Sequence, residues 1–310
     1  MSQVQRPVLA IVGPTASGKS TLGIEIALRL NGEIINCDSV QVYKEIQIAT
    51  AKVPLEERRG IPHHLIDVVS PRTNYTAGEW ARDAASIIEE VESRNRIPLL
   101  VGGTGFYLRA LRQPFFGSPQ TDEELRRRIT TIRELRGPEY LHRLLQRLDP
   151  AAAARFFPRD WPRVQRAVEV RLQTGRSIVS QLAERPQPHE STRRLRILAL
   201  NPPRQELYNR INSRTGVHFE LGLVDEVRQL LNKGIPADSN ALGAHGYRRV
   251  VEFLQGKRTL ESAVEQTKQD IRHYAKRQMT WFRHEPGVEW FDGFGEESSI
   301  LQSVLMAIED

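Results

Sequence analysis

The chain has a single cysteine, Cys37, among its 310 residues. One cysteine cannot form an internal disulfide bond, and proteins of the reducing cytoplasm usually lack such bonds. No apolar run approaches the roughly eighteen residues that a membrane helix needs, and the first apolar stretch meets Gly13-Pro14 too soon for a secretion signal. The sequence therefore predicts a cytoplasmic protein that does not insert into membranes, and we expect it to act as a monomer.

Lysine is absent from residues 115–200, where seventeen arginines outnumber ten acidic residues. This local balance of +7 is larger than the net charge of +6 for the whole chain, so the remaining residues are close to neutral together. Arginine can bind a phosphate through two hydrogen bonds or stack on an unpaired base. The clustering indicates a polyanionic partner for this segment.

Outside this segment, strand-like apolar runs alternate with helical periodicity. Strands are expected at residues 8–12, 33–36, 64–69, 99–101, 196–200 and 288–291, with helices such as 20–30 and 77–93 between several of them. This alternation predicts an α/β fold with a mostly parallel, doubly wound sheet flanked by helices. Between the fourth and fifth expected strands the sequence has the periodicity of amphipathic helices. We therefore expect a discontinuous core of residues 1–114 and 196–310 that carries a mostly helical insertion, residues 115–195.

A glycine-rich loop stands between the first expected strand and the first expected helix. Its residues match the pattern G-x-x-x-x-G-K-[ST] of P-loop proteins; they are Gly13, Pro14, Thr15, Ala16, Ser17, Gly18, Lys19 and Ser20. The glycines allow backbone N–H groups to surround phosphate oxygens, and the positive end of the helix dipole points at them. Lys19 adds a full charge, and the hydroxyl of Ser20 is placed to bind Mg²⁺. The sequence thus predicts a phosphate-binding core of the P-loop NTPase type.

A second element that NTPases and kinases use is missing. These enzymes usually hold Mg²⁺ with an aspartate at the end of an apolar strand, but residues 99–101 run into Gly102-Gly103-Thr104 instead, and Asp67 lies inside its own apolar run. This argues against a conventional NTP hydrolase, while a kinase of a small metabolite or nucleotide stays open as a second hypothesis. Asp38 follows the strand at 33–36, where it would either prepare an acceptor or cap the next helix.

Seven blocks of the sequence, taken in order, closely resemble the bacterial tRNA dimethylallyltransferases, also called isopentenyl-diphosphate:tRNA transferases. They are GPTASGKS, DSVQVYKEIQIATAK, GIPHHLIDV, NYTAGEW, IPLLVGGTGFY, ALGAHGYRRVVEFLQG and YAKRQMTWFR, spread from about Val8 to Trp290. The resemblance implies a P-loop core whose helical insertion grips the anticodon arm of tRNA. It further implies Mg²⁺-dependent transfer of the dimethylallyl group from dimethylallyl diphosphate to N6 of the adenine 3′-adjacent to the anticodon, with loss of diphosphate.

The resemblance assigns catalytic roles to three residues. The amino group of adenine is a poor nucleophile because its lone pair is delocalised into the ring, so a nearby base assists by removing its proton. Asp38 is implied to be this base. The leaving diphosphate gains charge that fixed donors and cations stabilise, and Thr15 and Arg214 are implied to bind it together with residues 13–20. Mg²⁺, held by Ser20, is the implied cofactor.

An adenine inside an anticodon loop has to turn outward to enter a pocket. The resemblance places this base against Asp38, Ser39, Val40 and Gln41, with Thr104 close by. The further positions that it assigns to tRNA binding are Arg126, Arg163, Val164, Gln165, Arg166, Tyr247 and Arg248. Without the resemblance, the arginines would be interpreted as surface charges. Prenylation of free AMP and a non-catalytic RNA-binding module are weaker alternatives, the first because it has less need of a cationic insertion.

Overall fold

The computed structural model describes residues 7–113, 122–184, 187–188 and 190–309. The chain divides into two compact units, one of residues 1–112 and 189–310 and one of residues 113–188. The helical unit therefore ends at residue 188 in the structure, whereas the sequence was interpreted as placing this boundary at residue 195. The reason is that the 3-10 helix η3 (Glu190–Arg194) packs against the first unit, where Arg194 forms an ion pair with Glu92 at 3.0 Å.

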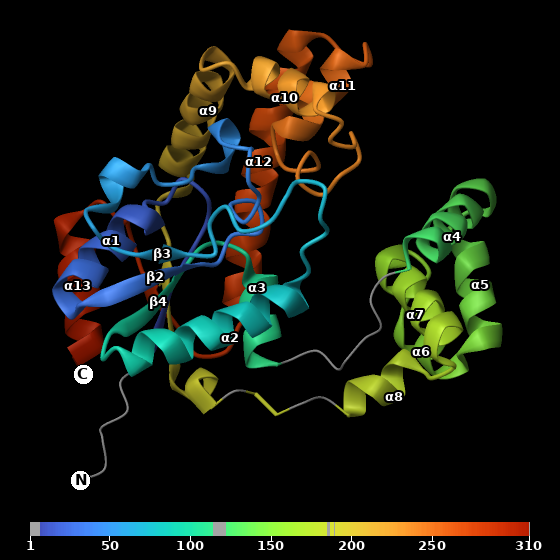
Figure 1. The fold of residues 1–310 in the computed structure, drawn as a ribbon, viewed down its shortest axis with the longest axis horizontal. Helices are drawn as coiled ribbons and strands as arrows, with labels where there is room; N and C mark the ends of the chain where they lie inside the picture. Colours follow the sequence, from blue (N-terminus) through green and yellow to red (C-terminus); the bar gives the residue numbers. More distant parts are fainter. Residues whose placement is uncertain (1–6, 114–121, 185–186, 189, 310) are drawn as a thin grey trace. The chain divides into compact units, whose positions relative to one another are not determined.

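The first unit contains a six-stranded sheet and its flanking helices (Figure 1). The strands are β1 (Val8–Val12), β2 (Gly32–Asn36), β3 (His63–His64), β4 (Ile97–Val101), β5 (Leu195–Leu200) and β6 (Val288–Phe291). The helices are α1 (Lys19–Leu30), α2 (Ala77–Ser93), α3 (Gly105–Arg112), α9 (Arg204–Glu220), α10 (Leu223–Asn232), α11 (Tyr247–Leu254), α12 (Leu260–Arg283) and α13 (Ser298–Glu309), with short 3-10 turns η1 (Ile48–Thr50) and η2 (Leu55–Arg58).

The strands are ordered β3-β2-β4-β1-β5-β6, and every pair of neighbours is parallel. Parallel strands place all their carboxyl ends at one edge, so the segments that follow β1, β2 and β4 meet there. This confirms the expected α/β fold. One expected strand is wrong: residues 64–69 do not continue β3, because Leu65 and Asp67 adopt left-handed φ angles of 60° and 56°. Only an isolated bridge from Val69 to Tyr43 follows.

Alternate residues of the central strands point into a core that α1 and α13 cover. Leu9 and Ile11 of β1 lie in one buried cluster with Ile26 of α1 and Val304 of α13. A separate helix pair, α2 and α3, packs near the end of β2, where the indole N–H of fully buried Trp80 donates to the carbonyl of the last strand residue at 2.8 Å. These layers fix the carboxyl end of β2 firmly.

The second unit is helical, with its own core. Its helices are α4 (Glu123–Arg136), α5 (Pro138–Leu148), α6 (Pro150–Arg155), α7 (Trp161–Thr174) and α8 (Ile178–Ala183). The first helix begins at an N-cap, where the carboxylate of Asp122 accepts the N–H groups of Glu124 and Leu125 at 3.0 Å. Leu141, Leu145 and Val168 are fully buried inside the unit.

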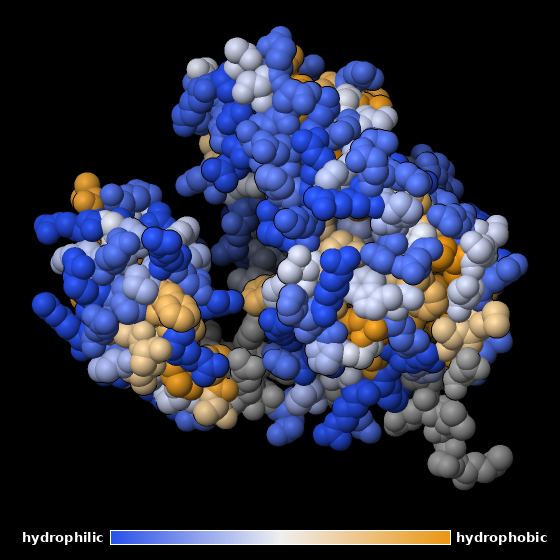
Figure 2. All heavy atoms as spheres, turned by 180° about the vertical axis from the view of Figure 1, so that it is seen from behind, coloured by the Kyte–Doolittle hydropathy of each residue, from blue (hydrophilic) through white to orange (hydrophobic). Residues whose placement is uncertain are grey.

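The surface is mostly hydrophilic on the face that Figure 2 shows, with small apolar patches between charged side chains. Among the residues that the structure describes, no helix combines the length and the apolar character that crossing a membrane would require.

Candidate active site

The loop after β1 has the backbone shape of a phosphate cradle. Gly13, Ala16 and Gly18 have positive φ angles of 141°, 64° and 81°, which turn successive N–H groups to one side. Gly18 is the N-cap of α1. A Cβ atom on it would stand 2.3 Å from the mobile carboxylate end of Glu296, and it is the left-handed backbone that favours glycine here.

Two cations and a hydroxyl converge on this loop. The ammonium of Lys19 donates to the carbonyl of Pro14 at 2.6 Å, and the guanidinium of Arg214, from α9, donates to the hydroxyl of Thr15 at 2.6 Å. Burial lowers the pKa of Lys19 to about 8, against the opposing attraction of Asp38. The structure thus brings together Thr15, Lys19 and Arg214, although 199 residues separate the hydroxyl from the guanidinium.

Asp38 stands at the carboxyl end of β2 and is positioned by Asn36. The side-chain oxygen of Asn36 accepts the N–H of Asp38 at 3.0 Å, and its amide donates to the carbonyls of Asp38 and Leu65 at 3.1 and 2.9 Å. One carboxylate oxygen of Asp38 accepts the N–H of Val40 at 2.8 Å. Burial raises the pKa of Asp38 from its ordinary value, although hydrogen bonding and the charges of Lys19 and Arg214 act in the other direction.

The loop after β4 supports the same region. The hydroxyl of Thr104 accepts the N–H of Ser39 at 3.1 Å, and the N–H of Thr104 donates to the carbonyl of Cys37 at 3.1 Å. Gly102 makes this contact possible, because a Cβ atom there would lie 2.1 Å from the Cys37 carbonyl oxygen. Cys37 itself is buried. The structure therefore places Thr104 next to Ser39.

These loops line one cleft of about 870 Å³ in the first unit. One wall is most of the phosphate loop, a second is Asp38, and a third is the segment from Gln41 to Lys52. The lining residues include Thr15, Lys19, Ser20, Asp38, Gln41, Thr50, Lys52, Arg210, Arg214, Gln278 and Glu296. The cleft is therefore lined by a phosphate cradle with its cations and by a buried carboxylate.

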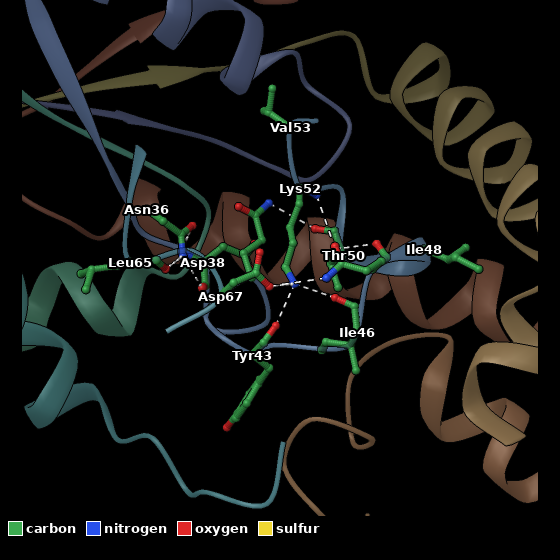
Figure 3. A network of polar contacts seen from close by, with 12 residues as sticks. Asn36, Asp38, Tyr43, Ile46, Ile48, Thr50, Lys52, Val53, Leu65 and Asp67 are labelled. Atoms are coloured by element: carbon green, nitrogen blue, oxygen red, sulfur yellow. Dashed lines mark hydrogen bonds and ion pairs between the residues drawn. The ribbon is translucent and has the colours of Figure 1, made fainter. Parts of the chain in front are cut away.

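Lys52 holds the third wall in shape (Figure 3). Its side chain is only 6% exposed, and its ammonium donates to the carbonyls of Tyr43 and Ile46 and to the carboxylate of Asp67 at 2.6 to 2.7 Å. Its three donors are thereby satisfied. Asp67, which the sequence analysis considered as a magnesium ligand, is thus the partner of a buried lysine.

Gln41 is fixed by the same wall. Its side-chain amide donates to the carbonyls of Thr50 and Ala51 at 3.1 Å, directly before Lys52. Ala49, in η1 just before them, has a φ angle of −96° that any residue adopts.

Sequence reasoning did not select Gln278, which lines the cleft from α12. Its side chain accepts the N–H of Thr15 at 2.8 Å and donates to the carbonyl of Gly103 at 2.9 Å. The sequence signal was weak, because one glutamine in a helix of charged and polar residues is indistinguishable from a surface residue. Its burial, at 4% exposure, is visible only in the structure.

The side chain of Tyr247, a residue expected to contact tRNA, faces the interior of the first unit. The ring is fully buried, and its hydroxyl donates to the carboxylate of Glu226 at 2.7 Å while accepting the N–H of Ala49 at 3.4 Å. The residue therefore connects α11 to α10 and η1. Its neighbour Arg248 lies at the surface, with 66% of its side chain exposed.

Two residues of the second unit that are expected to contact tRNA also have buried side chains. Val164 is fully buried and belongs to the core of that unit. Gln165 is 7% exposed and donates to Thr130 and Glu169 at 3.1 and 3.2 Å. Both side chains face inward because residues 164 and 165 lie on the side of α7 that packs against α4 and α5. They support the surface rather than form it.

The three arginines of the second unit that are expected to bind tRNA differ in their exposure. Arg126 pairs with the buried carboxylate of Glu169 through two hydrogen bonds of 2.9 and 2.8 Å, and Arg166 reaches the same carboxylate at 3.3 Å. Arg163 pairs with Asp160 and has 69% of its side chain exposed. Of these, Arg163 is the most open to a partner.

The comparisons with known proteins agree with this geometry. The sequence model described as IPP transferase matches residues 41–285, and the one described as isopentenyl transferase matches residues 6–67. The tRNA dimethylallyltransferases of Solibacter usitatus and Koribacter versatilis are each 46% identical, the first over 96% of this chain and 97% of its own length, the second over 97% and 98%.

Solved structures show the same relationship. The full-length tRNA isopentenylpyrophosphate transferase of Bacillus halodurans is 37% identical, with a TM-score of 0.71 over 98% of this chain and 97% of its own. A eukaryotic dimethylallyltransferase studied while acting on tRNA is 30% identical, with a TM-score of 0.81 over 98% of this chain and 78% of its own. These matches confirm the P-loop type of fold, and the chain belongs to the IPP transferase family.

Proposed function

We propose that this chain transfers the dimethylallyl group of dimethylallyl diphosphate to N6 of the adenine 3′-adjacent to the anticodon of tRNA and releases diphosphate. The observation that carries the proposal is that one cleft is lined both by the phosphate loop with Lys19 and Arg214 and by Asp38. A diphosphate donor and an acceptor that must lose a proton need these two kinds of group side by side.

The phosphate loop binds the donor. Its N–H groups and the start of α1 face the diphosphate, and Lys19 supplies a positive charge. The guanidinium of Arg214 and the hydroxyl of Thr15, which already bond to each other at 2.6 Å, reach the same group. As the bond between the allylic carbon and oxygen breaks, negative charge grows on the diphosphate, and these donors stabilise it.

Asp38 acts on the acceptor. The adenine N6 attacks the allylic carbon, a carbon–nitrogen bond forms, and the departing proton passes to the Asp38 carboxylate. Burial raises the pKa of this carboxyl, which makes it a stronger base than an exposed aspartate. Ser39, Val40 and Gln41 are proposed to contact the everted adenine, since they continue the chain from Asp38 and Thr104 steadies the first of them.

The residues of the cleft fit Mg²⁺ bound chiefly through the donor. Ser20 offers a hydroxyl in the cleft, and the described part of the chain holds no group of three or more His, Cys, Asp or Glu side chains able to bind a metal. Mg²⁺ commonly keeps several waters and binds substrate phosphates. When bound, it would neutralise part of the charge on the leaving diphosphate.

The helical unit is proposed to bind the anticodon arm. Its arginine excess supports this, and Arg163 is the exposed member of the expected set. Arg126 and Arg166 are proposed to contact tRNA while they stay paired with the carboxylate of Glu169. We further propose that Arg248 on the first unit contacts tRNA and that the protein works as a monomer.

Incubation with dimethylallyl diphosphate, Mg²⁺ and unmodified tRNA tests the function. Mass spectrometry of the digested tRNA should show prenylated adenine, and omission of Mg²⁺ should suppress it. Parallel reactions with free AMP as acceptor and with ATP as donor separate the alternatives. Phosphorylation from ATP without any prenylated adenine would favour the kinase, and a product only with AMP would contradict tRNA as the substrate.

A further inference from the structure

Gln278 is a buried side chain whose amide joins two loops of the cleft. Its oxygen accepts the N–H of Thr15 at 2.8 Å, and its nitrogen donates to the carbonyl of Gly103 at 2.9 Å. The orientation of the amide is fixed, because a backbone N–H can only donate and a carbonyl can only accept. Only 4% of its surface is exposed, so both bonds are largely shielded from solvent.

The two loops serve different substrates in the proposed reaction. Thr15 belongs to the phosphate loop, and its hydroxyl contacts Arg214 at 2.6 Å. Gly103 precedes Thr104, whose hydroxyl accepts the N–H of Ser39 at 3.1 Å, next to the proposed base. Gln278 is therefore one hydrogen bond away from the loop that holds the donor and from the loop that supports the acceptor wall.

The packing around the amide is tight enough to set a spacing. A Cβ atom on Gly103 would lie 2.0 Å from the amide nitrogen of Gln278, and one on Gly105 would lie 2.2 Å from the ring of Trp281. Residues 278 and 281 lie on one face of α12, three positions apart. The loop after β4 and the start of α3 thus each have glycine where α12 packs against them.

We propose that Gln278 is a positioning residue that holds the donor loop and the acceptor wall at a fixed separation. This inference rests on the proposed function. In the reaction, the adenine nitrogen must approach the allylic carbon to about 3–3.5 Å, and a displacement of about 1 Å can lower the rate on the order of a hundredfold. Loss of the amide lets the two loops move independently while each keeps its own substrate contacts.

The test measures the rate of the bound complex separately from the two affinities. Gln278→Met keeps the length of the side chain and removes both hydrogen bonds. We expect the single-turnover rate with saturating substrates to fall by about 10- to 100-fold. Affinities for dimethylallyl diphosphate alone, by calorimetry, and for unmodified tRNA alone, by filter binding, should change by less than about threefold. A role in folding alone would not separate the rate from the affinities in this way.

The matched control is Gln269→Met, which changes an exposed glutamine on the same helix and should leave the rate unchanged. Equal rates for Gln278→Met and the unaltered protein would overturn the inference, as would a loss confined to the affinity for one substrate. If the unaltered protein makes no prenylated adenine, the proposed function fails instead. If Gln278→Met does not fold, Gln278→Glu carries the test, because it keeps the acceptor for Thr15 and replaces the donor to Gly103.

A pair of substitutions tests the contact itself. Gly103→Ala should slow the reaction, because its Cβ displaces the Gln278 amide. In the presence of Gln278→Ala the same change meets no amide, and its nearest remaining neighbour is the Gly13 carbonyl oxygen at 3.2 Å, so adding Gly103→Ala should slow Gln278→Ala far less than it slows the unaltered protein. Rate losses that multiply would show that the two positions act independently and would contradict the proposed contact.

Discussion

Asn36 gives the sharpest prediction about how the fold prepares the proposed base. It is the last residue of β2, it is 2% exposed, and three hydrogen bonds of 2.9 to 3.1 Å tie its amide to Asp38 and Leu65. Asn36→Leu removes all three with little change in volume. The N–H and the carbonyl of Asp38 and the carbonyl of Leu65 then lose the partner that this amide supplies.

The magnitude follows from these three backbone groups, of which only the Leu65 carbonyl lies in a fully buried bond. A buried polar group without a partner costs about 1–3 kcal/mol, so the free energy of unfolding should fall by about 2–6 kcal/mol. The rate should fall as well, because Asp38 loses the group that fixes its backbone. A displacement of about 1 Å in the carboxylate is enough for a loss on the order of a hundredfold.

Urea unfolding and steady-state kinetics on the same preparation measure both effects. Asn201→Leu is the matched control. That asparagine follows β5 at the same edge of the sheet, but its amide bonds to Asp292 at 2.6 Å at the surface, and its loss should change stability by no more than about 0.5 kcal/mol. Asn36→Leu with unaltered stability and kcat would refute the view that this amide positions Asp38.

Three further predictions concern the same edge of the sheet. Burial raises the pKa of Asp38 above 3.8, and the base must be deprotonated to act. The acidic side of the kcat/KM–pH profile should therefore have its midpoint above pH 3.8, and a midpoint at or below 3.8 would contradict this. Gly102→Ala places a Cβ 2.1 Å from the Cys37 carbonyl, so urea unfolding should show a loss of about 1–3 kcal/mol from overpacking, and an unchanged midpoint would be contrary. Lys52→Met should reduce the free energy of unfolding by about 2 kcal/mol. Breaking a fully buried ion pair costs roughly 3–5 kcal/mol, and the loss here is smaller because Asp67 is 40% exposed. An unchanged free energy of unfolding would contradict the expected role of the pair.

The elements with strong local signals could be predicted from the sequence. The apolar run of β1 and the phosphate loop after it stand where the pattern put them, and α2 spans the predicted residues 77–93. The position of Asp38 at the carboxyl edge followed from the parallel sheet alone. These features depend on neighbours in the chain, so periodicity and turn chemistry are sufficient to find them.

The parts that depend on tertiary packing could not be predicted. The run at 64–69 has strand composition, but two left-handed residues interrupt it so that Asp67 can reach Lys52. Val164, Gln165 and Tyr247 lie in segments that resemble tRNA-contacting blocks, yet their side chains face the interior. A short block of similar sequence does not show which of its members point inward.

Gln278 could not be identified as a site residue from the sequence either. Both of its partners are backbone groups, 263 and 175 residues away in the chain, and backbone groups leave no residue type by which sequence could identify the contact. Only the packing of α12 against two loops reveals it.

The central claim is that Asp38 acts on a substrate whose donor is held by the neighbouring phosphate loop. Asp38→Asn keeps the size of the side chain and removes its capacity as a base. In single-turnover reactions with saturating dimethylallyl diphosphate, Mg²⁺ and tRNA, its rate should fall by about 10²–10⁴-fold while tRNA affinity stays nearly unchanged. Prenylated adenine formed at the normal rate by Asp38→Asn would contradict the account.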